Sequence, residues 1–389
     1  MEHVELETLD REHTASNKKD PQLNHEKKPT KKIIKVLKLI GTKTLLFAFI
    51  ILFIVGFSAL FGSTATYTGV CIVTGLLMFL KLDIGIKHTQ APFVIFGLFV
   101  LTGLSAFAAA INPWLGLLVN FITVCAIMVL SGQRAEYRSF MPFLLCYIFT
   151  QSTPVYGIDF GMRMASLAAG GALVGIIYFI VHRKKPCPKV GVLSAIKNTA
   201  SEYASVRTRF FLRMAIGMTI AMFIGDMIGS ARTLWLSLPI LSLTQLKPHE
   251  TAHRTAYRIF ATIIGGLIYI SVFDFIIPAE YLNIGLLVAG YIYTYINKYQ
   301  FQQIFVVISA LGSAHSLGLE SAVAWPARLI YLLIGVLIVA ILLMIDNANI
   351  WKKLKPTTSK NGWYATGTPK WNAVLATEYE ADQNNSAIL

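Results

Sequence analysis

The sequence predicts an all-α polytopic membrane protein with about 12 transmembrane helices, arranged as two parallel six-helix repeats. Hydrophobic residues make up 55% of the chain, and its mean hydropathy is +0.60. Charged residues make up only 14%, where a soluble domain carries about 25%. Of the 34 lysines and arginines, all but Arg163, Arg232 and Arg328 lie in the two tails, in every second loop between apolar runs, or at span edges that face those loops. This asymmetry is the positive-inside pattern of multi-pass membrane proteins.

The apolar runs define the predicted spans. A bilayer core about 30 Å thick requires about 20 apolar residues per helix. The first half contains runs near residues 44–61, 66–80, 91–111, 113–130, 139–152 and 160–181. The second half contains runs near residues 210–228, 233–246, 258–277, 281–296, 301–317 and 324–345. An even number of spans places both termini on the same side of the plasma membrane, and the basic residues of the tails indicate the cytoplasm.

Polar segments divide the chain into domains. We expect disordered cytoplasmic tails at both ends because these segments lack hydrophobic periodicity. The predicted order is a tail at 1–30, a basic segment at 31–43, a first repeat at 44–182, a linker at 183–209, a second repeat at 210–346 and a tail at 347–389.

The basic segment at 31–43 has two interpretations. It reads KKIIKVLKLIGTK, in which aliphatic residues stand among lysines. It is either an interfacial helix on anionic lipid headgroups or the first turns of the first span, with lysines that extend to the headgroups. Both interpretations make anionic lipids a predicted partner.

Local matches at an offset of about 165 residues indicate an internal duplication. Arg163, near the start of the sixth span, is followed seven residues later by Gly170. Arg328, near the start of the twelfth, is followed seven residues later by Gly335. Repeats with an even number of spans are parallel and related by an axis along the membrane normal, an arrangement that occurs in secondary transporters.

Short spans at matching positions of the two halves predict where a solute binds. The run at 233–246 contains Pro239 and polar side chains, including Ser237 and Gln245, and its counterpart at 66–80 is short as well. Irregular backbone in a membrane is tolerated where it lines a cavity or is buried in protein, so such segments mark candidate sites. The alternative is that they are tilted helices whose hydroxyl groups pack against neighbours.

The segment at 232–270 resembles the core motif of the fusaric acid resistance-like, or aromatic acid exporter, superfamily. It reads RTLWLSLPILSLTQLKPHETAHRTAYRIFATIIGGLIYI. In that motif a short helix with a tryptophan and a proline leads through a polar loop into a helix of the form R-I-x-x-T-x-x-G. The matching residues are Trp235, Pro239, Arg258, Ile259, Thr262 and Gly265.

A second match is the arginine-initiated last span, which begins near Arg328, so the resemblance covers roughly residues 209–345. It implies export of small, often aromatic, organic acids across the inner membrane. The first half departs from the pattern, because its corresponding segment, KHTQAPFVIFGLF at 87–99, contains no arginine. Larger relatives also carry cytoplasmic domains for which the linker of this chain is too short.

Charged side chains inside spans are costly and need a reason. Arg163 and Arg328 either form a cationic pair that binds a carboxylate, or have structural partners such as Asp159, Glu320 or loop carbonyls. Arg254 and Arg258 share a helical face and form either a vestibule that concentrates anions or an ordinary cytoplasmic loop. The predicted substrate-binding residues are Arg163, Trp235, Ser237, Gln245, Arg254, Arg258, Thr262 and Arg328.

Three residues are candidates for proton coupling. Asp226 and Asp274 lie near the outer ends of their spans, and His315 lies near the end of the eleventh. For the aspartates the alternative is a salt bridge to Arg232, which would account for at least one of the two. For His315 it is simple hydrogen bonding to neighbouring serines.

The pattern favours a secondary transporter that exports an organic, aromatic carboxylate, with an anion channel of the same architecture as the alternative. The chain lacks GxxxxGK[ST], HExxH and GxSxG motifs, so we expect neither nucleotide hydrolysis nor enzymatic activity. We expect no metal, cofactor or nucleic-acid partner, because the basic residues flank apolar spans and the cysteines show no ligand spacing. A homodimer is possible, and glycine pairs permit close helix approach.

Overall fold

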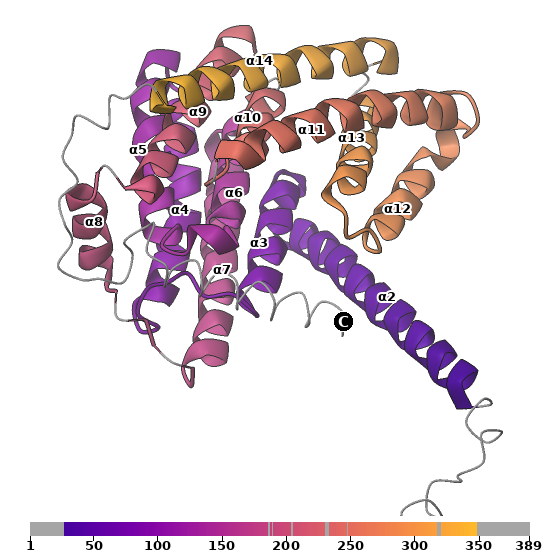
Figure 1. The fold of residues 1–389 in the computed structure, drawn as a ribbon, viewed down its shortest axis with the longest axis horizontal. Coiled ribbons are helices and arrows are strands. Elements are labelled where there is room, and N and C mark those ends of the chain that lie inside the picture. Colours follow the sequence, from indigo (N-terminus) through magenta and orange to yellow (C-terminus); the bar gives the residue numbers. More distant parts are fainter. Residues whose placement is uncertain are drawn as a thin grey trace, which may run out of the picture.

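The structure is a computed structural model that describes residues 27–347, apart from 186, 189, 204, 230–232, 247 and 317–319. Within these residues every regular element is a helix (Figure 1). The first half contains α2 (Lys27–Phe61), α3 (Thr66–Phe79), α4 (Ala91–Ala109), α5 (Pro113–Ser131), α6 (Met141–Ser152) and α7 (Gly157–His182). The linker contains α8 (Val192–Ser201). The second half contains α9 (Val206–Ile228), α10 (Thr233–Leu243), α11 (Pro248–Tyr269), α12 (Leu282–Tyr293), α13 (Tyr299–Ser316) and α14 (Ser321–Asn347).

The all-α membrane class is confirmed, but the predicted number of spans is not. Among the described residues, 7 helices are long and apolar enough to cross a membrane: α2, α4, α5, α7, α9, α11 with its π-helical extension, and α14. The remaining helices of the predicted set are shorter or more polar. For example, α10 has 11 residues and therefore a length of about 16 Å, roughly half of a bilayer core.

The basic segment at 31–43 belongs to a continuous helix. α2 runs without interruption from Lys27 to Phe61, so this segment forms the first turns of that helix, as the second of the two interpretations has it. Lys27 to Thr30, within the tail predicted to be disordered, are helical as well. The rest of that tail and the tail from residue 348 onward lie outside the described residues.

Corresponding pairs of helices pack together in the two halves. In the first half, α2 packs on α3 and α7, and α4 packs on α6 and α7. In the second half, α9 packs on α10 and α14, and α11 packs on α13 and α14. The contacts of α3 with α7 and of α10 with α14 also correspond. Adding the predicted offset of about 165 residues to the helices of each first-half pair gives the helices of the corresponding second-half pair.

Glycines at matching positions allow one of these contacts. A Cβ atom at Gly170 of α7 would collide with the Ile72 side chain of α3. A Cβ atom at Gly335 of α14 would lie 2.9 Å from Cβ of Pro239 on α10. In both halves the last helix thus approaches the short helix at the glycine seven residues after its arginine.

The orientation of the two halves differs from a simple parallel pair. In Figure 1, α11 and α14 run side by side and cross the direction of α4 and α7. The halves meet where α5 packs on α9 and α6 packs on α10. On the other side, α2 meets α12 through a hydrogen bond of 2.7 Å between the hydroxyls of Thr44 and Tyr291. The two-repeat arrangement is therefore not confirmed by the arrangement of the helices.

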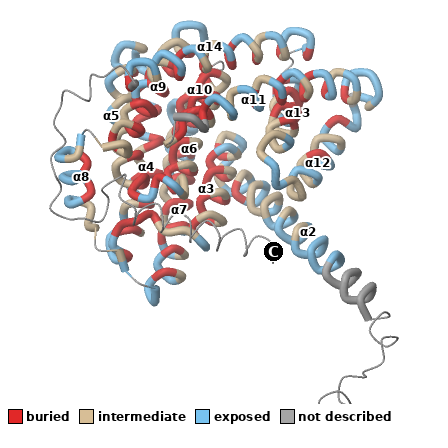
Figure 2. The backbone as a smooth tube through the Cα atoms, in the orientation of Figure 1, coloured by how far each residue is buried: buried red, intermediate tan, exposed pale blue. Residues whose placement is uncertain are grey.

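Buried side chains form two apolar clusters. The larger extends through both halves, and the smaller joins α11, α12, α13 and the start of α14. Figure 2 shows the buried residues concentrated in the helices at the centre of the molecule, whereas α2 is largely exposed or half-buried. Trp235 packs against both clusters. The boundary between the clusters therefore lies at α10.

Candidate anion-binding site

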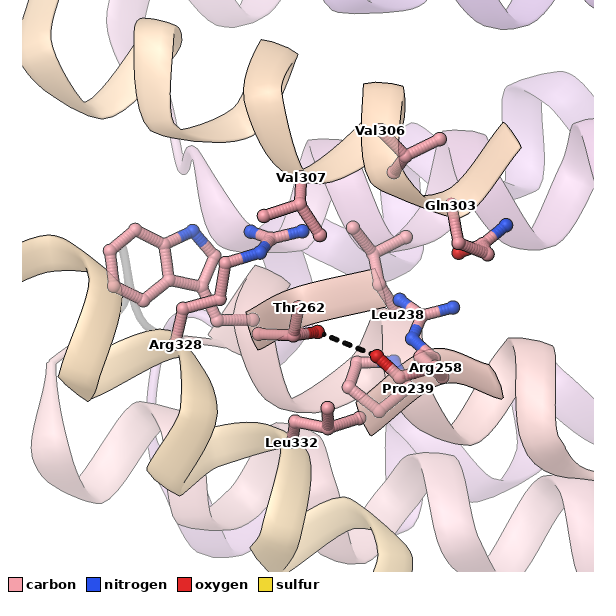
Figure 3. A pocket seen from close by; sticks show the side chains of 10 residues that line it. Leu238, Pro239, Arg258, Thr262, Gln303, Val306, Val307, Arg328 and Leu332 are labelled. Carbon is pink, nitrogen blue, oxygen red and sulfur yellow. Dashed lines mark hydrogen bonds between the residues drawn. The ribbon is translucent and has the colours of Figure 1, made fainter. Parts of the chain in front are cut away.

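Two buried arginines line the same small cavity at this boundary. Arg258 on α11 is 8% exposed, and Arg328 on α14 is 7% exposed. Figure 3 shows the cavity, which is lined by Trp235, Leu238, Pro239, Arg258, Thr262, Gln303, Val306, Val307, Arg328 and Leu332. The space open to the centre of a water molecule is about 10 Å³, which is enough for about one water. The site is therefore nearly closed in this conformation.

The short helix α10 forms one wall of the cavity. Pro239 lies inside this helix and lacks an N–H group, so the carbonyl four residues earlier receives no helical hydrogen bond from it. The indole of Trp235 packs against Tyr331, with ring centroids 6.0 Å apart. This wall is apolar apart from backbone groups, and it presents an aromatic face next to the two arginines.

The motif R-I-x-x-T-x-x-G organises the opposite wall. Arg258 extends into the cavity, and the Thr262 hydroxyl donates to the Arg258 carbonyl at 2.8 Å. The Thr262 carbonyl accepts from the Trp325 indole at 3.0 Å, which ties α11 to α14. A Cβ atom at Gly265 would lie 2.9 Å from the Ile304 carbonyl oxygen, so this glycine permits the close approach of α11 to α13. Each motif position thus has a distinct structural role.

Neither arginine of the cavity has a carboxylate partner within the part of the chain that the structure describes. The ion pairs found there join other residues. Arg258 donates to the Ser242 hydroxyl, a neutral acceptor. Two buried cations of like sign with no anion between them are unfavourable. Their guanidinium groups can each hold a carboxylate or another planar anion through paired hydrogen bonds.

Arg163, the predicted counterpart of Arg328, lies elsewhere and has other partners. It is 5% exposed and donates to the carbonyls of Thr64 at 3.2 Å, Thr150 at 3.4 Å and Thr153. These contacts connect α7 to the end of α6 and to the turn before α3. They match the interpretation in which loop carbonyls are the partners of this arginine.

Other predicted substrate-binding residues divide into two groups. Trp235 and Thr262 line the cavity, whereas Ser237 is fully buried and does not. Gln245 lies beyond the end of α10, where its side chain accepts from Arg138 and donates to the Ser242 carbonyl at 2.6 Å. The guanidinium carbon of Arg254 lies 4.9 Å from the ring centroid of Tyr299, so this arginine stacks on an aromatic ring outside the cavity.

The proton-coupling candidates lie in three different environments. Asp226 on α9 accepts from the Gln151 amide of α6 at 2.9 and 3.0 Å and from the Thr233 hydroxyl at 3.4 Å. Its predicted partner Arg232 lies outside the described residues. Asp274 is exposed and accepts from Ser321 at 3.1 Å. His315 is exposed near the end of α13.

Sequence reasoning missed one cluster of charges. The Asp346 carboxylate near the end of α14 is 9% exposed and pairs with Arg213 and with Arg209, the latter at 3.2 Å. Arg213 also donates to the Gln245 carbonyl at 3.0 Å. The sequence did contain a signal for this cluster. Arg213 lies inside an apolar run, four residues after Arg209, and a buried guanidinium needs a partner.

Residues 220–342 match the family model of fusaric acid resistance protein-like proteins. No curated protein and no solved structure matches the chain. The matched segment contains α10, α11, α13 and nearly all of α14, and hence every residue that lines the cavity. The family indicates a role in membrane transport or efflux. This match over residues 220–342 supports the resemblance to the fusaric acid resistance-like superfamily seen in the sequence.

Proposed function

We propose that the protein is a secondary transporter that exports small organic carboxylates across the plasma membrane, with Arg258 and Arg328 as the carboxylate-binding residues. The observation that carries this proposal is the pair of buried arginines at one cavity without a carboxylate partner among the described residues. A carboxylate neutralises one of the two positive charges and accepts bidentate hydrogen bonds from a guanidinium group. The indole of Trp235 beside them favours an aromatic carboxylate, because its face can stack on the ring of the solute.

Transport requires the site to open, because the cavity holds about one water in the present conformation. We assign this conformation to an occluded state. Opening on one side requires α10 or α14 to move relative to α11. The contacts that correspond between the halves, with Gly170 and Gly335 at matching positions, support two repeats that rock against each other. The basic tails and linker support cytoplasmic termini.

Protons are the proposed driving ion, and Asp226 is the proposed proton carrier. It lies where α6 of the first half meets α9 and α10 of the second, and its described partners are neutral. A carboxylate at that junction changes its hydrogen bonds when it takes up a proton, because it then becomes a donor. Protonation thus alters a contact between the halves.

Flux measurements test the site. Purified protein in liposomes is assayed with a panel of aromatic and aliphatic carboxylates, and the parent is compared with Arg258→Ala and Arg328→Ala. Each replacement removes charge-assisted hydrogen bonds and should raise KM by about tenfold to a hundredfold. Arg254→Ala is the matched control, because Arg254 lies one turn from Arg258 on the same helix but stacks on Tyr299 outside the cavity. Unchanged flux in both cavity variants would falsify the assignment.

An anion channel of the same architecture is the alternative from the sequence, since an arginine-lined path also suits conduction. The nearly closed cavity favours the transporter, because a conducting pore needs a continuous aqueous path. Unitary currents in planar bilayers would identify a channel. Saturable flux that depends on a proton gradient would identify the transporter.

A further inference from the structure

A second cavity lies along the same helices as the first, and it is closed in this conformation, with no space open to the centre of a water molecule. It is lined by Arg213, Thr244, Gln245, Thr251, Val339, Leu342 and Leu343. The first cavity and the second are both lined by α11 and α14, and both adjoin α10 or the residues that follow it. On α11, Thr251 precedes Arg258 by seven residues, a separation of about 10 Å along the axis. The two cavities therefore follow one another along α11 and α14.

Three buried polar atoms at this second cavity have no hydrogen-bond partner in the part of the chain that the structure describes. The Nε atom of Arg213 and the hydroxyl oxygens of Thr244 and Thr251 are buried and make no hydrogen bond among the described residues. These residues are 6%, 3% and 4% exposed, respectively. Buried polar groups are almost always hydrogen-bonded, so three unpartnered ones at a single cavity indicate an acceptor that binds there. All three can donate, which is the chemistry that a carboxylate oxygen requires.

The charge balance around the cavity leaves one positive charge. Arg209 and Arg213 share the single carboxylate of Asp346. Arg213 uses its other terminal nitrogen on the Gln245 carbonyl, so the Nε edge of its guanidinium remains for a ligand. A carboxylate ligand would therefore add a second negative charge, beside that of Asp346, to the pair Arg209 and Arg213.

The end of α10 connects the two cavities. Ser242 accepts from Arg258 of the first cavity through its hydroxyl, and from the Gln245 amide of the second through its carbonyl. A displacement of this turn therefore acts on both cavities at once.

We propose that the cavity formed by Arg213, Thr244 and Thr251 is a second carboxylate-binding station, which the substrate occupies on the cytoplasmic side before it reaches Arg258 and Arg328. This inference rests on the proposed function. It places the substrate path inside the second half, between α10, α11 and α14, where rocking of the two halves acts through α10, which packs on α6 of the first half.

The test removes the hydroxyl donors and leaves the arginines in place. Thr244→Val and Thr251→Val, singly and together, are assayed in inside-out liposomes with benzoate as the probe. The double variant should raise KM for benzoate about tenfold, because two hydrogen bonds to a charged ligand are lost, while kcat stays within about twofold. Thr255→Val is the control, since the Thr255 hydroxyl lies one turn further along α11 and is satisfied by the Thr251 carbonyl at 2.8 Å.

A second variant separates a binding role from a structural one. Asp346→Asn removes the internal carboxylate from Arg213 and Arg209, so benzoate should bind more tightly and KM should fall severalfold. A purely structural ion pair would instead give lower activity at unchanged KM. If the threonine double variant keeps the KM of Thr255→Val, the second station is wrong. If Arg258→Ala also leaves KM unchanged, the proposed function fails with it.

Discussion

Arg163 and Arg328 occupy matching positions in the two halves, but their surroundings differ. Arg163 is surrounded by three backbone carbonyls. Arg328 lies at a cavity shared with Arg258 and has no carboxylate partner among the described residues. The first half has no arginine that corresponds to Arg258, because the segment at 87–99 contains none. The same position thus stabilises the fold in one half, and the surroundings of its counterpart in the other half suit a ligand.

The largest expected effect distinguishes these two roles by stability. Arg163→Ala removes the donor of three carbonyls and should lower the free energy of unfolding by about 2–5 kcal/mol. Arg328→Ala removes a buried charge that has no carboxylate partner among the described residues, so stability should be unchanged or higher. Thermal unfolding of both variants in detergent measures the difference. Equal losses in Tm would mean that the two arginines have the same role.

Ligand-dependent stability sharpens the comparison. A carboxylate that binds the folded protein raises its apparent stability by about 2.7 kcal/mol at a hundredfold excess over Kd. Benzoate should therefore raise the Tm of the parent and fail to raise that of Arg328→Ala. Arg328→Lys keeps the charge but loses the bidentate geometry, and an intermediate shift is expected. A full shift in Arg328→Ala would place the ligand elsewhere.

The matching glycines give the next smaller effect. Gly335→Ala forces α14 away from Pro239 and should cost about 1–3 kcal/mol of stability and reduce transport, because that contact holds one wall of the cavity. Gly97→Ala is the control, since a Cβ atom there would meet nothing within 4 Å. It should be neutral or stabilise the helix by up to about 1 kcal/mol. Similar unfolding midpoints for the two variants would contradict the close contact.

The smallest effect is expected where α2 meets α12. Tyr291→Phe removes a hydroxyl that is 2.7 Å from that of Thr44 in an exposed contact. A loss of about 0.5–1 kcal/mol or less should follow, with little change in flux. Gln151→Leu, which removes the donor to Asp226 at the other junction, should alter the dependence of flux on pH. A larger change in flux from Tyr291→Phe would show that the α2–α12 side governs transport.

Much of the site was predictable, because its signals are local in the sequence. The spacing of Trp235, Pro239, Arg258 and Thr262 identified residues that do line one cavity, and the arginine of the last span added Arg328. The role of Gln245 was not predictable. Its partners Arg138 and Arg213 lie 107 and 32 residues away, and no local pattern carries such contacts.

The predicted number of spans is not confirmed for a related reason. A hydropathy pattern identifies apolar runs, but it does not identify the residue at which a helix ends within such a run. The run at 233–246 ends as a helix at Leu243, and the two residues that follow, Thr244 and Gln245, are buried in non-helical backbone. The all-α class, in contrast, depends on overall composition, which local breaks do not change.

The shortness of α10 has a consequence for how specificity can change. A helix of 11 residues that ends within the protein has its terminal turn fixed by Ser242 and Gln245, while Trp235 near its other end lines the first cavity. The residues that fix α10 in place and the residue that lines the cavity therefore lie at opposite ends of this helix. Replacements near Trp235 can therefore change the shape of the cavity and leave the contacts of Ser242 and Gln245 intact.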